Sequence, residues 1–174
     1  EMNIRDWSSD VCSSDLIVGE DPNLSDLLAN AEWDTPARQI RGYSCNVKHL
    51  AGNNYALLGN AAEFLDPVFS SGVTIAMKSA SLAASTLHRQ FSGEAVDWQS
   101  DYAEPLMTGV DTFRTYVEAW YEGSFQDVVF AENPSDSVKQ MISSILAGYA
   151  WDTKNPYVGE SRRRLATLAE LCRA

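Results

Sequence analysis

The sequence predicts a mainly α-helical chain with a few β-strands. Three observations support this fold class. Apolar residues recur at intervals of three and four over residues 73–91, which is the repeat of an amphipathic helix. Helical patterns also cover residues 102–122, 137–149 and 161–172. Alternating apolar residues, which are typical of strands, are found over residues 40–47.

The elements predicted before residue 60 are short. An Asp-Pro pair at 21–22 is a turn signal, and a helix is predicted over 24–31. The alternation over 40–47 predicts a strand or a pair of strands. A Gly-Asn-Asn turn at 52–54 then leads into a short apolar strand over 55–59.

The helix predicted over 73–91 is rich in small side chains, which allow a helix to pack closely on a neighbouring element. Gly93 lies just beyond its end and is a common helix stop. The apolar positions of this helix are Val73, Ala76, Met77, Ala80, Ala84, Leu87 and Phe91.

Three further helices are predicted in the second half of the chain. The first, 102–122, contains Gly109 as a candidate break, and the second covers 137–149. The third, 161–172, carries Arg162–Arg164 in its first turn, which is the end of the helix dipole that disfavours cations. We interpret these arginines as a solvated or acid-paired face rather than as a site for an anionic partner.

The aromatic residues in and after the first of these helices admit two interpretations. At helical spacing such residues usually form a core, and this is the favoured interpretation. The alternative is a pocket for a planar or acyl substrate. The residues are Phe113, Tyr116, Trp120, Tyr121, Phe125 and Phe130.

The composition limits the partners of the protein. A formal net charge of −11 disfavours a phosphate-binding face and predicts no nucleic-acid partner. No apolar run reaches membrane-spanning length, and no signal peptide is visible. After residue 16 the cysteines are Cys45 and Cys172, which have neither disulfide-framework nor metal-ligand spacing, so a cytoplasmic protein without a metal site is predicted.

Residues 1–16 differ from the rest of the chain. They repeat Ser-Ser-Asp and show no apolar periodicity. The run Asp6–Leu16 can be encoded by a nucleotide string that resembles a common sequencing-library adapter. We therefore interpret residues 1–16 as adapter-derived and not native. Because they hold four acidic residues and one arginine, residues 17–174 carry a net charge of −8.

Residues 55–85 carry the candidate chemistry. Their order is a strand, a glycine-containing loop, Pro67, Gly72 and a helix. This order leaves the backbone amides of Ser71, Gly72 and Val73 without helical acceptors, at the positive end of the helix dipole. An anion or an electron-rich carbonyl can bind there, and a flat ligand can approach Gly72 closely. From the spacing alone, a strand-loop-helix turn without any ligand is the favoured interpretation.

Residues 57–76, LLGNAAEFLDPVFSSGVTIA, resemble the second flavin-contacting motif of the FAD-dependent monooxygenase and halogenase superfamily. The Asp-Pro-Val-Phe-Ser-Ser-Gly form is more similar to flavin-dependent, tryptophan halogenase-like enzymes than to hydroxylases. Residues 120–133 and 145–158 resemble the C-terminal helical portion of the same branch. The resemblance implies the C-terminal part of an α/β FAD-binding fold, with a partial FAD-binding domain over 17–93 and a helical region over 94–174.

The resemblance also implies which residues contact the cofactor. Gly59 and Asn60 match a Gly-Asp pair whose carboxylate holds the ribityl hydroxyls of FAD. Asn60 departs from the usual Asp, although an amide still donates and accepts hydrogen bonds. Ser71 and Gly72 match the positions that hold the halide. The implied cofactor-binding residues are Gly59, Asn60, Pro67, Ser70, Ser71, Gly72 and Val73.

The function implied by the resemblance is that of a truncated FAD-dependent oxidoreductase. Its parent is a flavin-dependent halogenase that uses reduced FAD, dioxygen and halide. The implied partners are a small-molecule or carrier-bound aromatic substrate and a flavin reductase that supplies reduced flavin. The family's dinucleotide fingerprint and catalytic lysine are expected upstream, so the fragment is predicted to be inactive alone.

Two alternatives stay open. One is a flavin reductase, dehydrogenase or monooxygenase of the same superfamily without halide chemistry. The other is a non-catalytic helical binding module. No catalytic residue is assigned: Lys78, His49 and His88 are predicted to be surface residues, and Phe-Ser-Ser-Gly lacks the frame of a nucleophile elbow.

Overall fold

The computed structural model describes residues 18–32, 44–132 and 135–173. The chain divides into two compact units, Glu1–Arg41 and Gly42–Ala174. In the first, helix α2 (Pro22–Leu28) begins after Asp21, whose carboxylate accepts hydrogen bonds from the amides of Asn23 and Leu24 at 2.9 and 3.0 Å. The Asp-Pro pair therefore starts the helix. The adapter-like residues 1–16 and residues 40–43 of the predicted strand lie outside the described residues.

The second unit begins with two small antiparallel sheets of two strands each. The turn predicted at 52–54 is confirmed as the hairpin turn between β2 and β3. The strand predicted over 55–59 is shorter in the structure, where it covers Tyr55–Ala56. Gly59, with a φ of +53°, begins the 3₁₀ helix η1 (Gly59–Ala61) instead. The strands are β1 (Cys45–Asn46), β2 (Ala51–Gly52), β3 (Tyr55–Ala56) and β4 (Glu63–Phe64); β1 pairs with β4 and β2 with β3.

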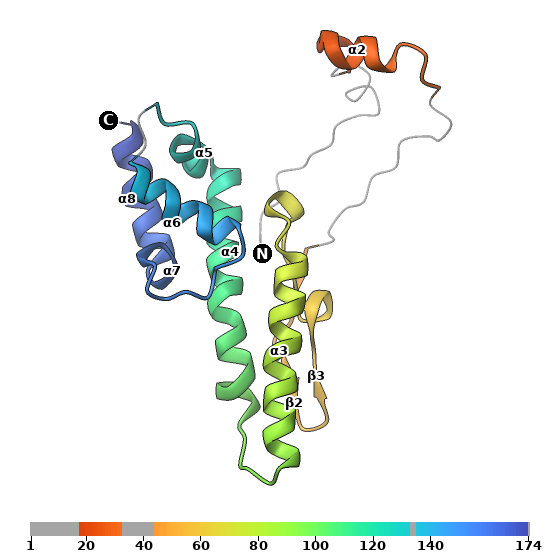
Figure 1. Ribbon diagram of the computed structural model, residues 1–174, viewed down its shortest axis with the longest axis vertical. Helices are drawn as coiled ribbons and strands as arrows, with labels where there is room; N and C mark the ends of the chain where they lie inside the picture. Colours follow the sequence, from red (N-terminus) through yellow and green to blue (C-terminus); the bar gives the residue numbers. More distant parts are fainter. Residues whose placement is uncertain (1–17, 33–43, 133–134, 174) are drawn as a thin grey trace. The chain divides into compact units, whose positions relative to one another are not determined.

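Two long helices follow and lie side by side (Figure 1). Helix α3 (Gly72–Phe91) agrees with its prediction. Helix α4 (Glu104–Glu122) is preceded by a π-helical turn, η3 (Gln99–Ala103). The wider turn suits Pro105, which has no N–H to donate to the turn before it. The predicted break at Gly109 does not occur, because α4 runs through it.

Four shorter helices gather around the C-terminal half of α4 (Figure 1). Gly123, with a φ of +88°, ends α4 and allows the chain to turn at once into the next helix. The helices predicted over 137–149 and 161–172 are confirmed with small shifts of their ends. The four are α5 (Ser124–Val129), α6 (Asp136–Leu146), α7 (Pro156–Gly159) and α8 (Ser161–Arg173).

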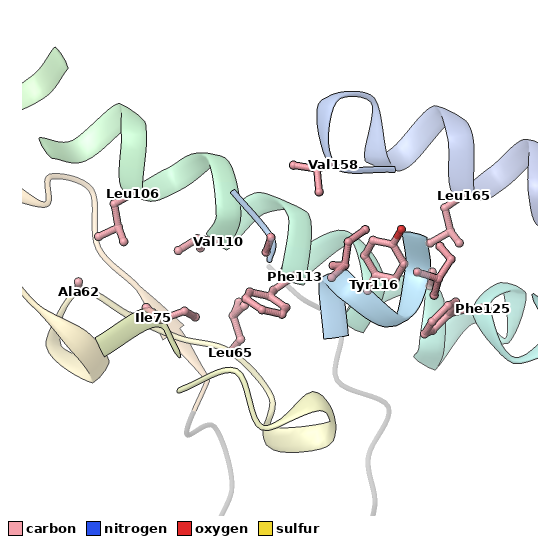
Figure 2. Close-up of a cluster of buried hydrophobic side chains, with 14 of the residues drawn as sticks. Ala62, Leu65, Ile75, Leu106, Val110, Phe113, Tyr116, Phe125, Val158 and Leu165 are labelled. Carbon is pink, nitrogen blue, oxygen red and sulfur yellow. The ribbon is translucent and has the colours of Figure 1, made fainter. Parts of the chain in front are cut away.

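The core lies between these helices and the loop before α3. Figure 2 shows Ala62 and Leu65 of that loop and Ile75 of α3 in one cluster with α4. Further along, the same cluster continues into α5, α7 and α8. The α4 members labelled in the figure are Leu106, Val110, Phe113 and Tyr116, and the later ones are Phe125, Val158 and Leu165.

The aromatic residues divide between core and surface. Phe113, Tyr116 and Phe125 are fully buried, so the core interpretation is right for them. Tyr121 and Phe130 are exposed and belong neither to the core nor to a described pocket.

The predicted roles of most charged residues also agree with the structure. Arg162 pairs with Glu118 at 2.6 Å, and Arg163 and Arg164 both pair with Glu160, which confirms the acid-paired face. His49 and His88 are exposed, as predicted. Lys78 was predicted to be exposed, but it is half-buried, with its ammonium 5.6 Å from the centre of the Trp151 ring. In the described part of the chain no helix is long and apolar enough to cross a membrane.

Trp151, in the loop between α6 and α7, packs on the backbone of α4. Its indole N–H donates to the carbonyl oxygens of Pro105 and Leu106 at 3.0 and 3.1 Å. A Cβ placed on Gly109 would overlap the indole ring. Gly109 is therefore required for contact with Trp151 and not for a break in the helix.

We predict that Gly109→Ala lowers the free energy of unfolding by about 1–3 kcal/mol, because the added methyl displaces the indole. In a Trp151→Ala background the same change is expected to stabilise the protein, by up to about 1 kcal/mol, since Ala is the better helix former. Urea unfolding of the four proteins measures both effects. Equal effects in both backgrounds would show that the indole is not the obstacle.

A second prediction concerns acid stability near η3. The amide of Asp97 and the guanidinium of Arg89 donate to the Asp101 carboxylate at 2.9 and 3.0 Å and lower its pKa below the ordinary 3.8. A carboxyl with a lowered folded-state pKa stabilises the fold above its unfolded pKa and loses that contribution as the pH falls through the folded value. Asp101→Asn should therefore flatten the loss of stability below about pH 4. Identical pH profiles of unfolding for both proteins would contradict this.

Candidate functional site

A hollow open to solvent lies where the loop before α3 meets the start of that helix. Its volume is about 590 Å³. Five of the seven residues implied by the resemblance line it, whereas Gly59 and Ser71 are buried beneath its surface. The lining residues are Asn60, Glu63, Phe64, Leu65, Asp66, Pro67, Ser70, Gly72, Val73 and Ala76.

The first turn of the loop is fixed to α3 by one buried hydroxyl. The amide of Gly59 donates to Oγ of Ser79 at 2.9 Å, and that hydroxyl donates to the carbonyl of Ala76, also at 2.9 Å. A Cβ on residue 59 would lie 3.3 Å from Cβ of Ala76. A residue with a side chain would also have to adopt the left-handed backbone conformation that Gly59 has here. The amide of Gly59 is thus already used within the protein, and the neighbouring Asn60 is exposed to the hollow.

The second turn is the 3₁₀ helix η2 (Pro67–Phe69). Asp66 caps it by accepting the amide of Val68 at 2.9 Å, and Pro67 occupies the first position, which needs no N–H. Ser70 then adopts a left-handed conformation with a φ of +52°, which is unfavourable for a residue with a side chain. Such strain is concentrated at functional sites, because the surrounding structure must hold it in place.

Aromatic contacts supply part of that support. The ring of Phe69 meets the rings of Trp120 and Phe125 edge to face, at centroid distances of 6.0 and 5.7 Å. Trp120 lies near the end of α4 and Phe125 lies in α5. These two helices therefore hold the loop through the side chain of Phe69. The residue next to the strained Ser70 is therefore anchored in the core.

The start of α3 presents free backbone donors. Within the described residues, no hydrogen bond uses the amides of Ser71, Gly72 or Val73 as donor. Ser71 itself is buried, and its carbonyl accepts the amide of Ile75 at 2.9 Å. Among the described residues, and chain neighbours apart, the one atom within 4 Å of a Cβ placed on Gly72 would be the side-chain oxygen of Asn60, at 3.8 Å. The amides of Gly72 and Val73 and the open face of Gly72 thus form a surface that a flat ligand or a small anion can reach.

A buried ion pair borders the same hollow and was not predicted. Glu63, which is 5% exposed, pairs with Arg114 of α4 at 2.8 Å, and Arg114 also bonds Asp111. The ion pair offsets part of the negative charge of Glu63 at the edge of the hollow, because Arg114 is shared with Asp111. No pattern in the sequence joins residues 63 and 114, because the contact depends on how β4 lies against α4.

The chain was compared with known proteins. No model of a known protein family matches it. Among characterised relatives, a 1H-pyrrole-2-carbonyl-[peptidyl-carrier protein] chlorinase of Pseudomonas fluorescens is 26% identical over 85% of the chain and 33% of its own length. A flavin-dependent halogenase of Metacordyceps chlamydosporia is 30% identical over 65% of the chain and 21% of its own length.

A solved structure is also similar. A flavoprotein/dehydrogenase from Cytophaga hutchinsonii is 40% identical and matches 91% of the chain and 39% of its own length, with a TM-score of 0.82. The homologues of the chain are thus flavin-dependent halogenases and a flavoprotein, and the chain spans at most about two fifths of the length of these proteins. The fold agrees with that of part of an FAD-binding protein, as the sequence predicted.

The Ser79 hydroxyl gives a test of how the loop is held. We predict that Ser79→Ala lowers the free energy of unfolding by about 1–3 kcal/mol, because the buried amide of Gly59 loses its acceptor. Ser85→Ala, at an exposed position of the same helix, should change it by less than about 0.5 kcal/mol. Chemical denaturation of the two variants measures the difference, and similar values for both would mean that the hydroxyl does not fix the loop.

Proposed function

We propose that this chain is the flavin-facing part of a longer FAD-dependent oxidoreductase of the halogenase-like branch. One observation carries the proposal: the free amides of Gly72 and Val73 lie at a hollow whose floor has no side chain at Gly72, and the free amide of the buried Ser71 lies next to them in the chain. The flavin-dependent halogenases among the relatives of the chain support the same assignment.

The residues of the hollow fit a flavin. The isoalloxazine ring is flat, with apolar edges and two carbonyl groups, and it needs both apolar contacts and backbone donors. Pro67, Val73 and Ala76 offer apolar contacts, and the amides at the start of α3 offer backbone donors. The side chain of Asn60 is close enough to Gly72 to donate to or accept from a ribityl hydroxyl of FAD.

In the proposed reaction the bound flavin, with dioxygen, supplies the oxidising power. The chain's own contribution is electrostatic. The amides of Ser71 and Gly72, together with the positive end of the α3 dipole, bind a halide close to the flavin edge. We extend the proposal to a small or carrier-bound aromatic substrate, a separate flavin reductase and a cytoplasmic location, which suits the free cysteines Cys45 and Cys172.

A second candidate function is a flavin-dependent dehydrogenase without halide chemistry. It is favoured by the Cytophaga hutchinsonii flavoprotein/dehydrogenase, which has a higher identity to this chain than either halogenase described above. The same amides would then donate hydrogen bonds to a flavin carbonyl and bind no halide. A non-catalytic helical module is disfavoured by the flavin-dependent relatives.

The two functions are separated by variants of the full-length protein that contains this chain. We predict that Gly72→Val abolishes halogenated product and lowers flavin occupancy, because the side chain enters the hollow. Ser71→Ala should keep both, since its buried hydroxyl is not needed and the amide remains. Flavin absorbance and halide-dependent product are measured together for each protein.

Full flavin occupancy without any halide-dependent product in the wild type would favour the dehydrogenase. Loss of product in Ser71→Ala at full flavin occupancy would show that the hydroxyl, rather than the amide, holds the halide.

A further inference from the structure

Helix α3 has an apolar face that the described part of the second unit does not cover. Val73, Met77 and Phe91 are 71%, 70% and 82% exposed, and Leu87 is also exposed. Ala80 and Ala84 lie between them and are exposed as well. We call this face the α3 stripe; it consists of Val73, Met77, Ala80, Ala84, Leu87 and Phe91.

The stripe is not the face by which α3 joins the core. The buried side chains of α3 are Ile75, Ser79, Ala83 and Thr86, which lie on a different side of the helix. The side that faces the core is thus partly polar, and the most apolar side faces solvent. A contiguous exposed apolar face of this kind marks an interaction surface.

The spacing of the stripe indicates a helical partner. Its members follow one another at intervals of four, three, four, three and four, which is the repeat of a seam between two packed helices. Small residues occupy the middle, at Ala80 and Ala84, and large ones occupy the ends. A partner helix can therefore approach the centre closely while Met77, Leu87 and Phe91 pack on either side of it. None of the six residues is charged, so the partner's face must be apolar too.

The stripe is continuous with the candidate flavin site. Val73 belongs to both, and Ala76, one turn along α3, also lines the hollow. The chain matches 39% of the length of the Cytophaga hutchinsonii flavoprotein, so most of that protein has no counterpart here. A helix packed on the stripe would lie at the mouth of the hollow.

We infer that the α3 stripe is the surface on which the remainder of the flavoprotein packs, through an apolar helix that also closes the hollow beside Val73. The inference rests on the proposed function and names the partner of the same site. A second copy of this chain is the competing occupant, because the side chains along the stripe are large, small and large again in either direction. The test separates a second copy from a helix of the remaining flavoprotein.

The test uses the whole chain co-expressed with the segment of the Cytophaga hutchinsonii flavoprotein that lies outside the match. Only the chain carries an affinity tag. Ala80→Glu places a charge in the middle of the stripe without touching the core. Ser85→Glu places the same charge at an exposed position of α3 outside the stripe and is the matched control. Recovered complex, flavin absorbance and the sedimentation of the chain alone are measured, and circular dichroism checks that each variant is helical.

The expected result is a complex with the wild type and with Ser85→Glu, and a loss of recovered complex of about tenfold or more with Ala80→Glu. A complex that contains no flavin would support the interface and count against the proposed function. Equal recovery with Ala80→Glu would overturn the inference, as would a folded wild-type chain that does not bind the segment. A wild-type chain that sediments as a dimer, and becomes a monomer with Ala80→Glu, would assign the stripe to a second copy and overturn it too.

Discussion

The packing of α4 against its neighbours is the interaction on which the rest of the second unit depends. Helices α3, α5 and α8 all contact α4. Its buried residues include polar ones that need partners: the hydroxyl of Tyr116 donates to the carbonyl of Tyr157 at 3.3 Å, and burial raises its pKa above the ordinary value. Trp151 adds two further hydrogen bonds to the backbone of α4. The short helices α5–α8 are therefore held by α4 rather than by their own length, which is too small for stability in isolation.

The candidate site depends on the same helices. Its loop is attached to the helices by Ser79 of α3, by Arg114 of α4 and by the rings of Trp120 and Phe125. The hydroxyl of Tyr102 in η3 also donates to the carbonyl of Leu57. These attachments leave the backbone donors at the start of α3 free while they fix the residues on either side. A rigid loop with unsatisfied amides is preorganised for a ligand, because little conformational entropy is lost when the ligand binds.

The chemistry of the loop explains why two functions fit it. Backbone amides and a helix dipole attract any electron-rich group, whether it is a halide or a carbonyl of the flavin ring. Because these donors belong to the backbone, no side chain among them distinguishes a halide from a flavin carbonyl. Under the proposed function, groups outside this loop would decide between halogenation and dehydrogenation, and the surface of α3 is where we infer that they pack.

The sequence alone predicted the helices, because a period of three to four depends only on neighbours along the chain. It also located the loop at residues 57–76, through the order of Gly59, Pro67 and Gly72 before a helix and through the resemblance to a flavin-contacting motif. The tertiary structure alone decided which side of α3 is buried: Ser79 and Thr86 face the protein, and the apolar stripe faces outward. It also decided the role of Gly109 and the pairing of Glu63 with Arg114. Those contacts join residues more than forty positions apart. A pattern among neighbouring residues does not indicate which distant residues meet in the fold.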